Sequence, residues 1–124
     1  MDASDSDEIA AALREADEEI ALPPSVVTII GTTDLYRTIT GYSITPVIGI
    51  IPPDLEFRPN AQEVEAVFEV PLSFLLNPAN HQIQVIDWQG EPRSYYEMHW
   101  DGRCIWGATA AMIVNLSRRL QWPV

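Results

Sequence analysis

Four acidic residues and one arginine fall close together near the start of the chain, in the stretch LREADEEIAL that begins at Leu13. On a helix, residues three and four positions apart share a face, so Glu15, Glu18 and Glu19 converge. Like charges at this spacing destabilise an isolated helix by about 0.2–0.5 kcal/mol per pair. A hard divalent cation such as Mg²⁺ or Mn²⁺ would offset the repulsion, because it prefers oxygen ligands and bridges readily to substrate phosphates.

Arg14 stands four residues before Glu18, at the spacing where it can pair with that carboxylate and orient it. A solvated acidic face is the competing interpretation of the same charges, and composition by itself favours it. The placement of the carboxylates therefore has to decide between a metal site and an ordinary charged surface.

An amphipathic helix over about residues 6–21 would position these side chains. Asp5 or Ser6 can cap its first turn, and Pro23 and Pro24 end it, since proline lacks the amide hydrogen and disfavours helix in the residue before it. One apolar stripe recurs at steps of four, three and four residues: Ile9, Leu13, Ala16 and Ile20.

The rest of the chain predicts strands followed by a second helix. Residues 25–31, 42–51 and 63–72 read as strands, residues 32–41 as a polar loop or hairpin, and residues 72–76 as a short helix. Residues 81–107 predict a meander of three strands broken at QGEP and WDGR. A helix over about 107–121 follows, with Arg118 and Arg119 at its C-terminal end. Its expected apolar face comprises Thr109, Met112, Ile113, Leu116 and Leu120. We expect one α+β domain over residues 1–124, with helices flanking a mixed sheet.

Composition excludes several classes of partner. The chain has 124 residues, 47% of them hydrophobic, and a formal net charge of −11, a sign that opposes binding to nucleic-acid phosphates or an anionic membrane. The single cysteine, Cys104, cannot form an internal disulfide and is predicted to be a small buried hydrophobe. His99 is predicted to be an ordinary strand residue. The acidic start MDASDSDE is unlike a signal peptide, so we expect a cytoplasmic protein.

The string READEEIAL resembles the second half of the Nudix box, and it departs from that pattern only at Ala21, where the box has glycine. Further segments are similar to the coenzyme A pyrophosphatase branch of that superfamily and follow in the same order along nearly the whole chain. They are AAALREADEEIALPP from Ala10, TGYSITPVIGIIPPDLEFRPN from Thr40, EVEAVFEVPLSFLL from Glu63 and IWGATAAMI from Ile105.

The resemblance implies a Nudix-like α/β/α sandwich that hydrolyses a nucleoside diphosphate linked to another group. Glu15, Glu18 and Glu19 would ligate Mg²⁺ or Mn²⁺, and Arg14 would hold the carboxylates in place. Glu63 is a candidate general base or further ligand, with a solvated strand-edge glutamate as the alternative. In the coenzyme A branch the products would be 3′,5′-adenosine diphosphate and 4′-phosphopantetheine.

The chain also departs from the family pattern at its start. The glycine that opens the box and the first sheet strands are expected before Met1, and Ser6 occupies the position of an earlier acidic residue. We therefore expect a partial domain whose unpaired sheet edges would favour a homodimer. Two alternatives stay open beside coenzyme A hydrolysis: hydrolysis of another nucleotide such as ADP-ribose, and an inactive fragment that serves as a partner-binding remnant.

Overall fold

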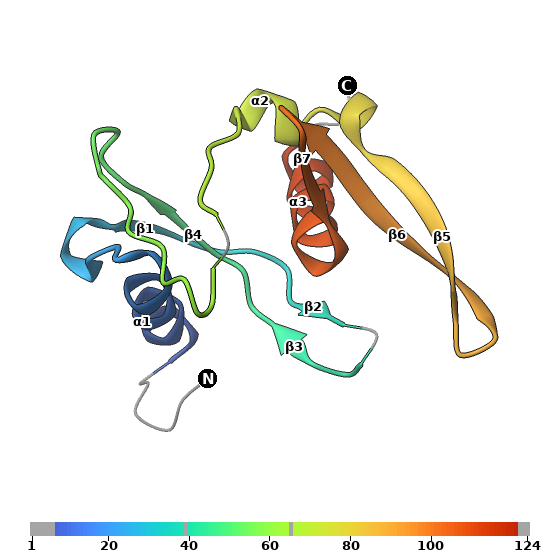
Figure 1. Ribbon diagram of the computed structural model, residues 1–124, viewed down its shortest axis with the longest axis horizontal. Helices are drawn as coiled ribbons and strands as arrows, with labels where there is room; N and C mark the ends of the chain where they lie inside the picture. Colours follow the sequence, from blue (N-terminus) through green and yellow to red (C-terminus); the bar gives the residue numbers. More distant parts are fainter. Residues whose placement is uncertain (1–6, 39, 65, 122–124) are drawn as a thin grey trace. The chain divides into compact units, whose positions relative to one another are not determined.

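The computed structural model describes residues 7–38, 40–64 and 66–121 (Figure 1). Helices and antiparallel strands give the expected α+β class. The chain divides into two compact units. The α1 unit comprises Met1–Thr33 and Thr45–Glu69, and the α3 unit comprises Asp34–Ile44 and Val70–Val124.

The first helix, α1 (Glu8–Ile20), has nearly the expected bounds. The Asp7 side chain caps it by accepting a hydrogen bond from the Ala10 amide at 2.8 Å. Asp5 and Ser6, the predicted caps, lie outside the described residues. The helix ends at Ala21, and a single 3₁₀ turn, η1 (Pro24–Val26), follows the prolines.

A two-stranded antiparallel sheet completes the α1 unit, formed by β1 (Thr28–Thr32) and β4 (Val47–Ile50). The predicted apolar stripe of α1 is half-buried and faces an apolar cavity of about 240 Å³. Leu13 and Ala16 of the helix line this cavity together with Ile29 and Val47 of the two strands. The helix therefore covers the sheet incompletely.

The strand predicted over residues 63–72 is wrong. Within the described residues, positions 64 and 66–70 form no ladder with another segment, and the short helix α2 (Leu72–Leu75) follows as expected. Alternating apolar residues make a segment suited to a sheet, but a strand also needs a neighbour that exchanges backbone hydrogen bonds with it. The described strands pair antiparallel in three small sheets.

The predicted three-strand meander is confirmed in the α3 unit. After the 3₁₀ turn η2 (Pro78–Asn80), β5 (Gln82–Trp88), β6 (Glu91–Trp100) and β7 (Arg103–Trp106) pair in the order β5–β6–β7. Each connecting turn has two residues with positive φ: Gln89 and Gly90 (51° and 81°), and Asp101 and Gly102 (48° and 75°). Positive φ at both central residues matches the right-handed twist of the flanking strands.

The last helix, α3 (Gly107–Leu120), packs on this meander through small residues. Ala110, Ala111, Val114 and Ser117 are buried, and Met98 of β6 is fully buried in a core cluster with Ala110 and Val114. The predicted apolar face is wrong at Thr109 and Leu120, which are exposed. Met112, Ile113 and Leu116 are half-buried, and Ile113 packs against the core. The buried face therefore combines small residues with the larger Val114, and hydrophobicity alone did not predict it.

A short hairpin of β2 (Tyr36–Arg37) and β3 (Ser43–Ile44) also belongs to the α3 unit. The hairpin expected over residues 32–41 thus extends further along the chain, and the strand expected over residues 42–51 is divided into β3 and β4. Asp34, just before β2, forms an ion pair with Arg119 of α3 at 3.1 Å. This contact ties the start of the hairpin segment to the C-terminal end of α3.

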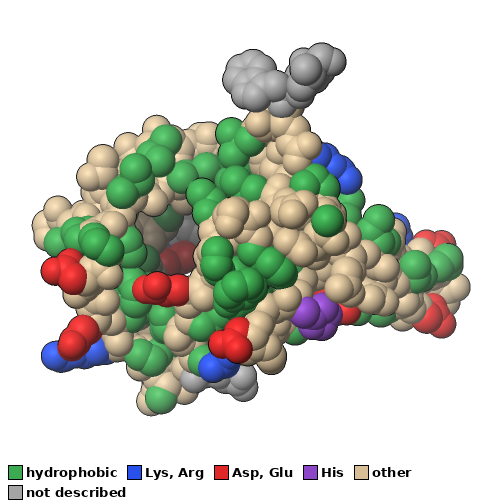
Figure 2. Space-filling view, turned by 90° about the horizontal axis from the view of Figure 1, so that it is seen from above, with side chains coloured by type: hydrophobic (Ala, Val, Ile, Leu, Met, Phe, Trp, Pro, Cys, Tyr) green, Lys and Arg blue, Asp and Glu red, His purple; other side chains and the backbone are tan. Residues whose placement is uncertain are grey.

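Many large hydrophobic side chains are exposed, as the hydrophobic atoms on the surface in Figure 2 illustrate. On β5, Ile83 and Val85 are 64% and 66% exposed. In the described part of the chain, no helix has the length and apolar character needed to cross a membrane.

Candidate active site

Three glutamates project from the exposed side of α1. Glu15, Glu18 and Glu19 are all solvent-exposed, and the side chains of Glu15 and Glu18 keep 53% and 57% of their accessible surface. Their positions along the helix follow from the spacing i, i+3 and i+4. The three carboxylates are therefore available to a ligand from solvent.

Arg14 contacts two of these carboxylates. Its Nη1 donates to Glu18 Oε2 at 3.0 Å, which confirms the predicted pairing, and its Nη2 lies 3.6 Å from Glu15 Oε1. Exposed ion pairs of this kind contribute only about 0–1 kcal/mol to stability. Their main consequence is geometric, because the guanidinium fork restricts two carboxylates to one side of the helix.

The charge at this end of α1 is unbalanced. The last turn carries no basic residue, so Glu18 and Glu19 lie at the negative end of the helix dipole without a local counter-charge from that turn. Carboxylate oxygens are the donors that Mg²⁺ and Mn²⁺ prefer. The donor set therefore fits a hard divalent cation.

The carboxylate oxygens of Glu15, Glu18 and Glu19 do not all lie close enough to one another to bind one metal ion in the observed rotamers. Among the described residues, the group of three possible ligands with atoms within 4.8 Å of one another lies elsewhere, on β6 and β7. Shared coordination on α1 would require the glutamate side chains to change rotamer, which exposed side chains do readily. The assignment of Glu15, Glu18 and Glu19 as metal ligands stays a prediction.

Backbone contacts bring the segment containing Glu63 to the C-terminal end of α1. The amides of Arg58 and Asn60 donate to the carbonyls of Ile20 and Glu19 at 3.0 and 2.7 Å. The Glu63 amide in turn donates to the Asn60 carbonyl at 2.9 Å, within a turn. Glu63 is therefore held one short turn away from the residues that dock on the helix end, and its role as base or ligand stays a prediction.

Ala21, the residue at the departure from the Nudix pattern, has the left-handed conformation, with φ 57° and ψ 40°. Its amide donates to the Asp17 carbonyl at 3.0 Å, and the Leu22 amide donates to the Ala16 carbonyl at 3.4 Å. This is the hydrogen-bonding pattern of a helix terminus that glycine favours. The structure thus gives a backbone reason for glycine at this position of the box.

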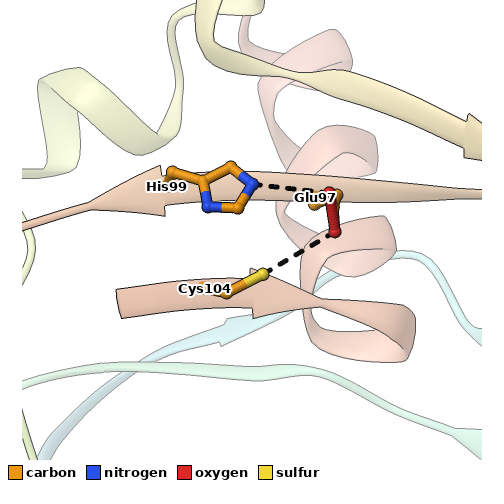
Figure 3. Close-up of side chains that lie close together, drawn as sticks. All are labelled: Glu97, His99 and Cys104. Atoms are coloured by element: carbon orange, nitrogen blue, oxygen red, sulfur yellow. Dashed lines mark hydrogen bonds and ion pairs between the residues drawn. The ribbon is translucent and has the colours of Figure 1, made fainter. Parts of the chain in front are cut away.

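A second group of chemically active side chains lies on the β6–β7 hairpin, where Glu97, His99 and Cys104 come together (Figure 3). His99 Nε2 lies 3.4 Å from Glu97 Oε1, and the Cys104 thiol donates to Glu97 Oε2 at 3.7 Å. The prediction that Cys104 is buried is wrong, because the residue is exposed. Loss of hydration around the sulfur and the neighbouring Glu97 carboxylate both raise the pKa of the Cys104 thiol.

Sequence reasoning missed this group although one signal for it was present. The Asp101-Gly102 turn fixes the hairpin register, so that His99 lies opposite Cys104. Glu97 is two residues before His99 and thus on the same face of β6. His99 and Cys104 are five residues apart in the sequence, yet they are directly opposed across the two strands.

The α3 unit also contains an apolar cavity of about 460 Å³ with aromatic walls. Trp88, Tyr95 and Trp106 contribute to its lining, and the rings of Tyr95 and Trp106 meet edge to face at 6.3 Å. Cavities of this size and character accept small organic ligands.

Comparison with known proteins adds evidence of homology. No protein-family model matches the chain. Over 120 residues, 97% of the chain, it is 42% identical to a protein of Escherichia coli (strain K12) named "Uncharacterized Nudix hydrolase NudL". A protein of the same name from Shigella boydii serotype 4 (strain Sb227) gives the same identity and coverage. The chain spans 62% of the length of each of these relatives.

Proposed function

Because this chain belongs to the Nudix hydrolase superfamily, we propose that it hydrolyses the diphosphate anhydride of a nucleoside diphosphate-linked substrate, with coenzyme A or its derivatives as the substrate class. The products would be 3′,5′-adenosine diphosphate and 4′-phosphopantetheine. The observation that carries the proposal is the exposed face of α1, where Arg14 contacts two of three glutamates at the spacing of the Nudix box.

Each residue on this face has a distinct part in the proposed reaction. Glu15, Glu18 and Glu19 would hold Mg²⁺ or Mn²⁺, and the Arg14 guanidinium, which contacts Glu15 and Glu18, would orient these two carboxylates. The bound cation supplies charge neutralisation of the diphosphate and a lowered pKa of a water molecule. Glu63 would accept a proton from the attacking water or serve as a further ligand; in support, backbone hydrogen bonds dock the residues just before its turn on the C-terminal end of α1.

Two observations support this assignment. The unbalanced negative charge of the α1 terminus disfavours an isolated helix and is relieved by a cation. The choice of coenzyme A rests on the resemblance of the segments that begin at Ala10, Thr40, Glu63 and Ile105 to the coenzyme A branch.

The test is incubation of the purified chain with coenzyme A and Mn²⁺, followed by product separation and mass spectrometry. We expect both products from the native chain and none from a Glu18→Gln, Glu19→Gln double variant. Asp17→Asn is the matched control, because it removes an exposed carboxylate of the same helix from outside the proposed ligand set. Absence of 3′,5′-adenosine diphosphate above the double-variant background would refute the proposed activity.

A substrate panel separates the chemistry from the choice of substrate. Hydrolysis of ADP-ribose, with coenzyme A left intact, would keep the reaction class and overturn the coenzyme A assignment. Inclusion of both substrates at equal concentration in one reaction gives the ratio of kcat/KM directly, since competing substrates share the same enzyme.

Association with a second copy is a separate part of the proposal. β5 is an edge strand of its sheet, and its exposed Ile83 and Val85 suit strand pairing between chains. Light scattering of the native chain should give the mass of a homodimer, and an Ile83→Lys, Val85→Lys variant should give that of a monomer. A native chain that is monomeric at high concentration would exclude this association.

A further inference from the structure

We propose that the β6–β7 hairpin carries a zinc site formed by Glu97, His99 and Cys104, on residues different from the α1 carboxylates. Its ligand would be a borderline divalent cation that accepts sulfur, nitrogen and oxygen donors together, with Zn²⁺ as the cation that best matches this mixed set.

The strand register brings the three side chains to one place. His99 and Cys104 are directly opposed across β6 and β7, and Glu97 shares the His99 face of β6. Met98 and Ile105, the neighbouring opposed pair, belong to the core against α3. Alternation along both strands therefore directs Glu97, His99 and Cys104 away from that core, as Figure 3 shows with α3 behind the hairpin.

The three ligand atoms lie close enough to converge on one zinc ion. With zinc–nitrogen and zinc–oxygen bonds of about 2.1 Å and a zinc–sulfur bond of about 2.3 Å, tetrahedral angles put nitrogen about 3.4 Å and sulfur about 3.6 Å from the oxygen. The observed separations are of similar size but end on different oxygens: 3.4 Å from His99 Nε2 to Glu97 Oε1, and 3.7 Å from Cys104 Sγ to Glu97 Oε2. All three ligand atoms lie within 4.8 Å of one another, so small side-chain rotations would be enough for binding.

The chemistry of the set distinguishes it from the α1 carboxylates. Mg²⁺ selects oxygen ligands and gains little from a thiolate or an imidazole, whereas zinc is bound in proteins by the donors present here. Three protein ligands leave the fourth tetrahedral position for water. The Glu97 side chain is 18% exposed and that of His99 is 51% exposed, which gives solvent access to that position.

The hydrogen bonds of the metal-free cluster pre-organise the site. Glu97 accepts from the Cys104 thiol through one oxygen and faces the His99 ring with the other. Zinc binding would replace these contacts with bonds to the metal, and the thiol would release its proton to solvent. Little backbone rearrangement is needed, since the hairpin already fixes the ligand positions.

Cobalt substitution tests the site with a readout independent of hydrolysis. The full chain is titrated with Co²⁺ under reducing conditions, and we expect a thiolate-to-cobalt charge-transfer band in the near ultraviolet that Zn²⁺ displaces stoichiometrically. Cys104→Ser should abolish the band. His99→Gln and Glu97→Gln should each weaken Zn²⁺ binding by about tenfold or more, because loss of even an outer-shell partner costs about 10–100-fold.

Two controls separate this site from other carboxylates. Glu91→Gln changes an exposed glutamate of the same strand outside the cluster and should leave the band unchanged. The Glu18→Gln, Glu19→Gln double variant should also retain it, while losing hydrolysis if the proposed function holds. Absence of a charge-transfer band in the native chain, or its persistence at equal Co²⁺ affinity in His99→Gln, would overturn the zinc site.

Discussion

Replacement of Ala21 by glycine should stabilise the protein, although most substitutions destabilise. Ala21 terminates α1 with φ 57°, a region in which a Cβ atom is crowded against the backbone. The hydrogen bonds from the Ala21 and Leu22 amides to Asp17 and Ala16 require this conformation. Alanine therefore bears a conformational strain here that glycine would not.

The magnitude follows from two opposing terms. The left-handed conformation costs an L-residue about 1–2 kcal/mol. Glycine avoids this cost in the folded state. It also gives the unfolded chain more conformational freedom, which lowers the free energy of unfolding by about 0.4–1 kcal/mol. The net stabilisation of Ala21→Gly is thus about 0.5–1 kcal/mol, or about 2–5 °C in Tm for a chain of this size.

Thermal unfolding monitored by far-ultraviolet circular dichroism would measure the shift, and urea unfolding would give the free energy independently. Ala12→Gly is the matched control, because it makes the same chemical change in the interior of α1. There glycine costs about 1 kcal/mol, so Tm should fall. A Tm of Ala21→Gly equal to or below that of the native chain would show that the helix terminus does not hold Ala21 in the left-handed region.

Further predictions concern the carboxylates and the core. Mg²⁺ at a hundred times its Kd should stabilise the native chain by about 2.7 kcal/mol, measured as a rise in Tm, and a Glu18→Gln variant should lose most of this rise. The pKa of Cys104 is raised by loss of hydration around the sulfur and by the Glu97 carboxylate, and Glu97→Gln removes the charge of that carboxylate; the pKa should therefore fall and alkylation by iodoacetamide near pH 8 should accelerate, and an unchanged rate would contradict the assigned role of Glu97. Met98→Ala should cost about 2–5 kcal/mol in urea unfolding, because the side chain is fully buried; a loss below 1 kcal/mol would show that the α3–sheet interface collapses around the cavity.

Local signals made much of this structure predictable. The proline pair marked the end of α1, and the i, i+4 spacing anticipated the ion pair between Arg14 and Glu18. The two turns containing Gly90 and Gly102 marked the breaks in the meander, because they supply the positive φ that tight hairpins need. In each case a few neighbouring residues contained the relevant information.

Features that depend on distant neighbours were not predictable in this way. Residues 66–70 have a strand-like pattern, but the structure assigns no strand there. The buried face of α3 comprises Ala110, Ala111, Val114 and Ser117; Ala110 and Val114 form the core with Met98 of the meander, whereas Ser117 donates to the Leu76 carbonyl. The low hydrophobicity of Ala110 and Ser117 gave no indication of these contacts.

The candidate site residues show the same difference between local and long-range information. The α1 glutamates could be recognised from spacing, whereas Cys104 was misplaced because burial was inferred from residue type rather than from strand alternation. The left-handed conformation at position 21 explains why the Nudix pattern has glycine there, but it does not explain the alanine of this chain.

The nearest-neighbour order of β5, β6, β7 and α3 has a consequence for the folding pathway. Each of these elements contacts one that adjoins it in sequence, so little chain entropy is lost before favourable contacts form. Pairing of β1 with β4 instead requires closure across the intervening segment, which contains the β2–β3 hairpin of the other unit. In pulsed hydrogen exchange during refolding, amides of β6 should therefore acquire protection before those of β1, which makes the C-terminal meander the kinetic nucleus of the chain.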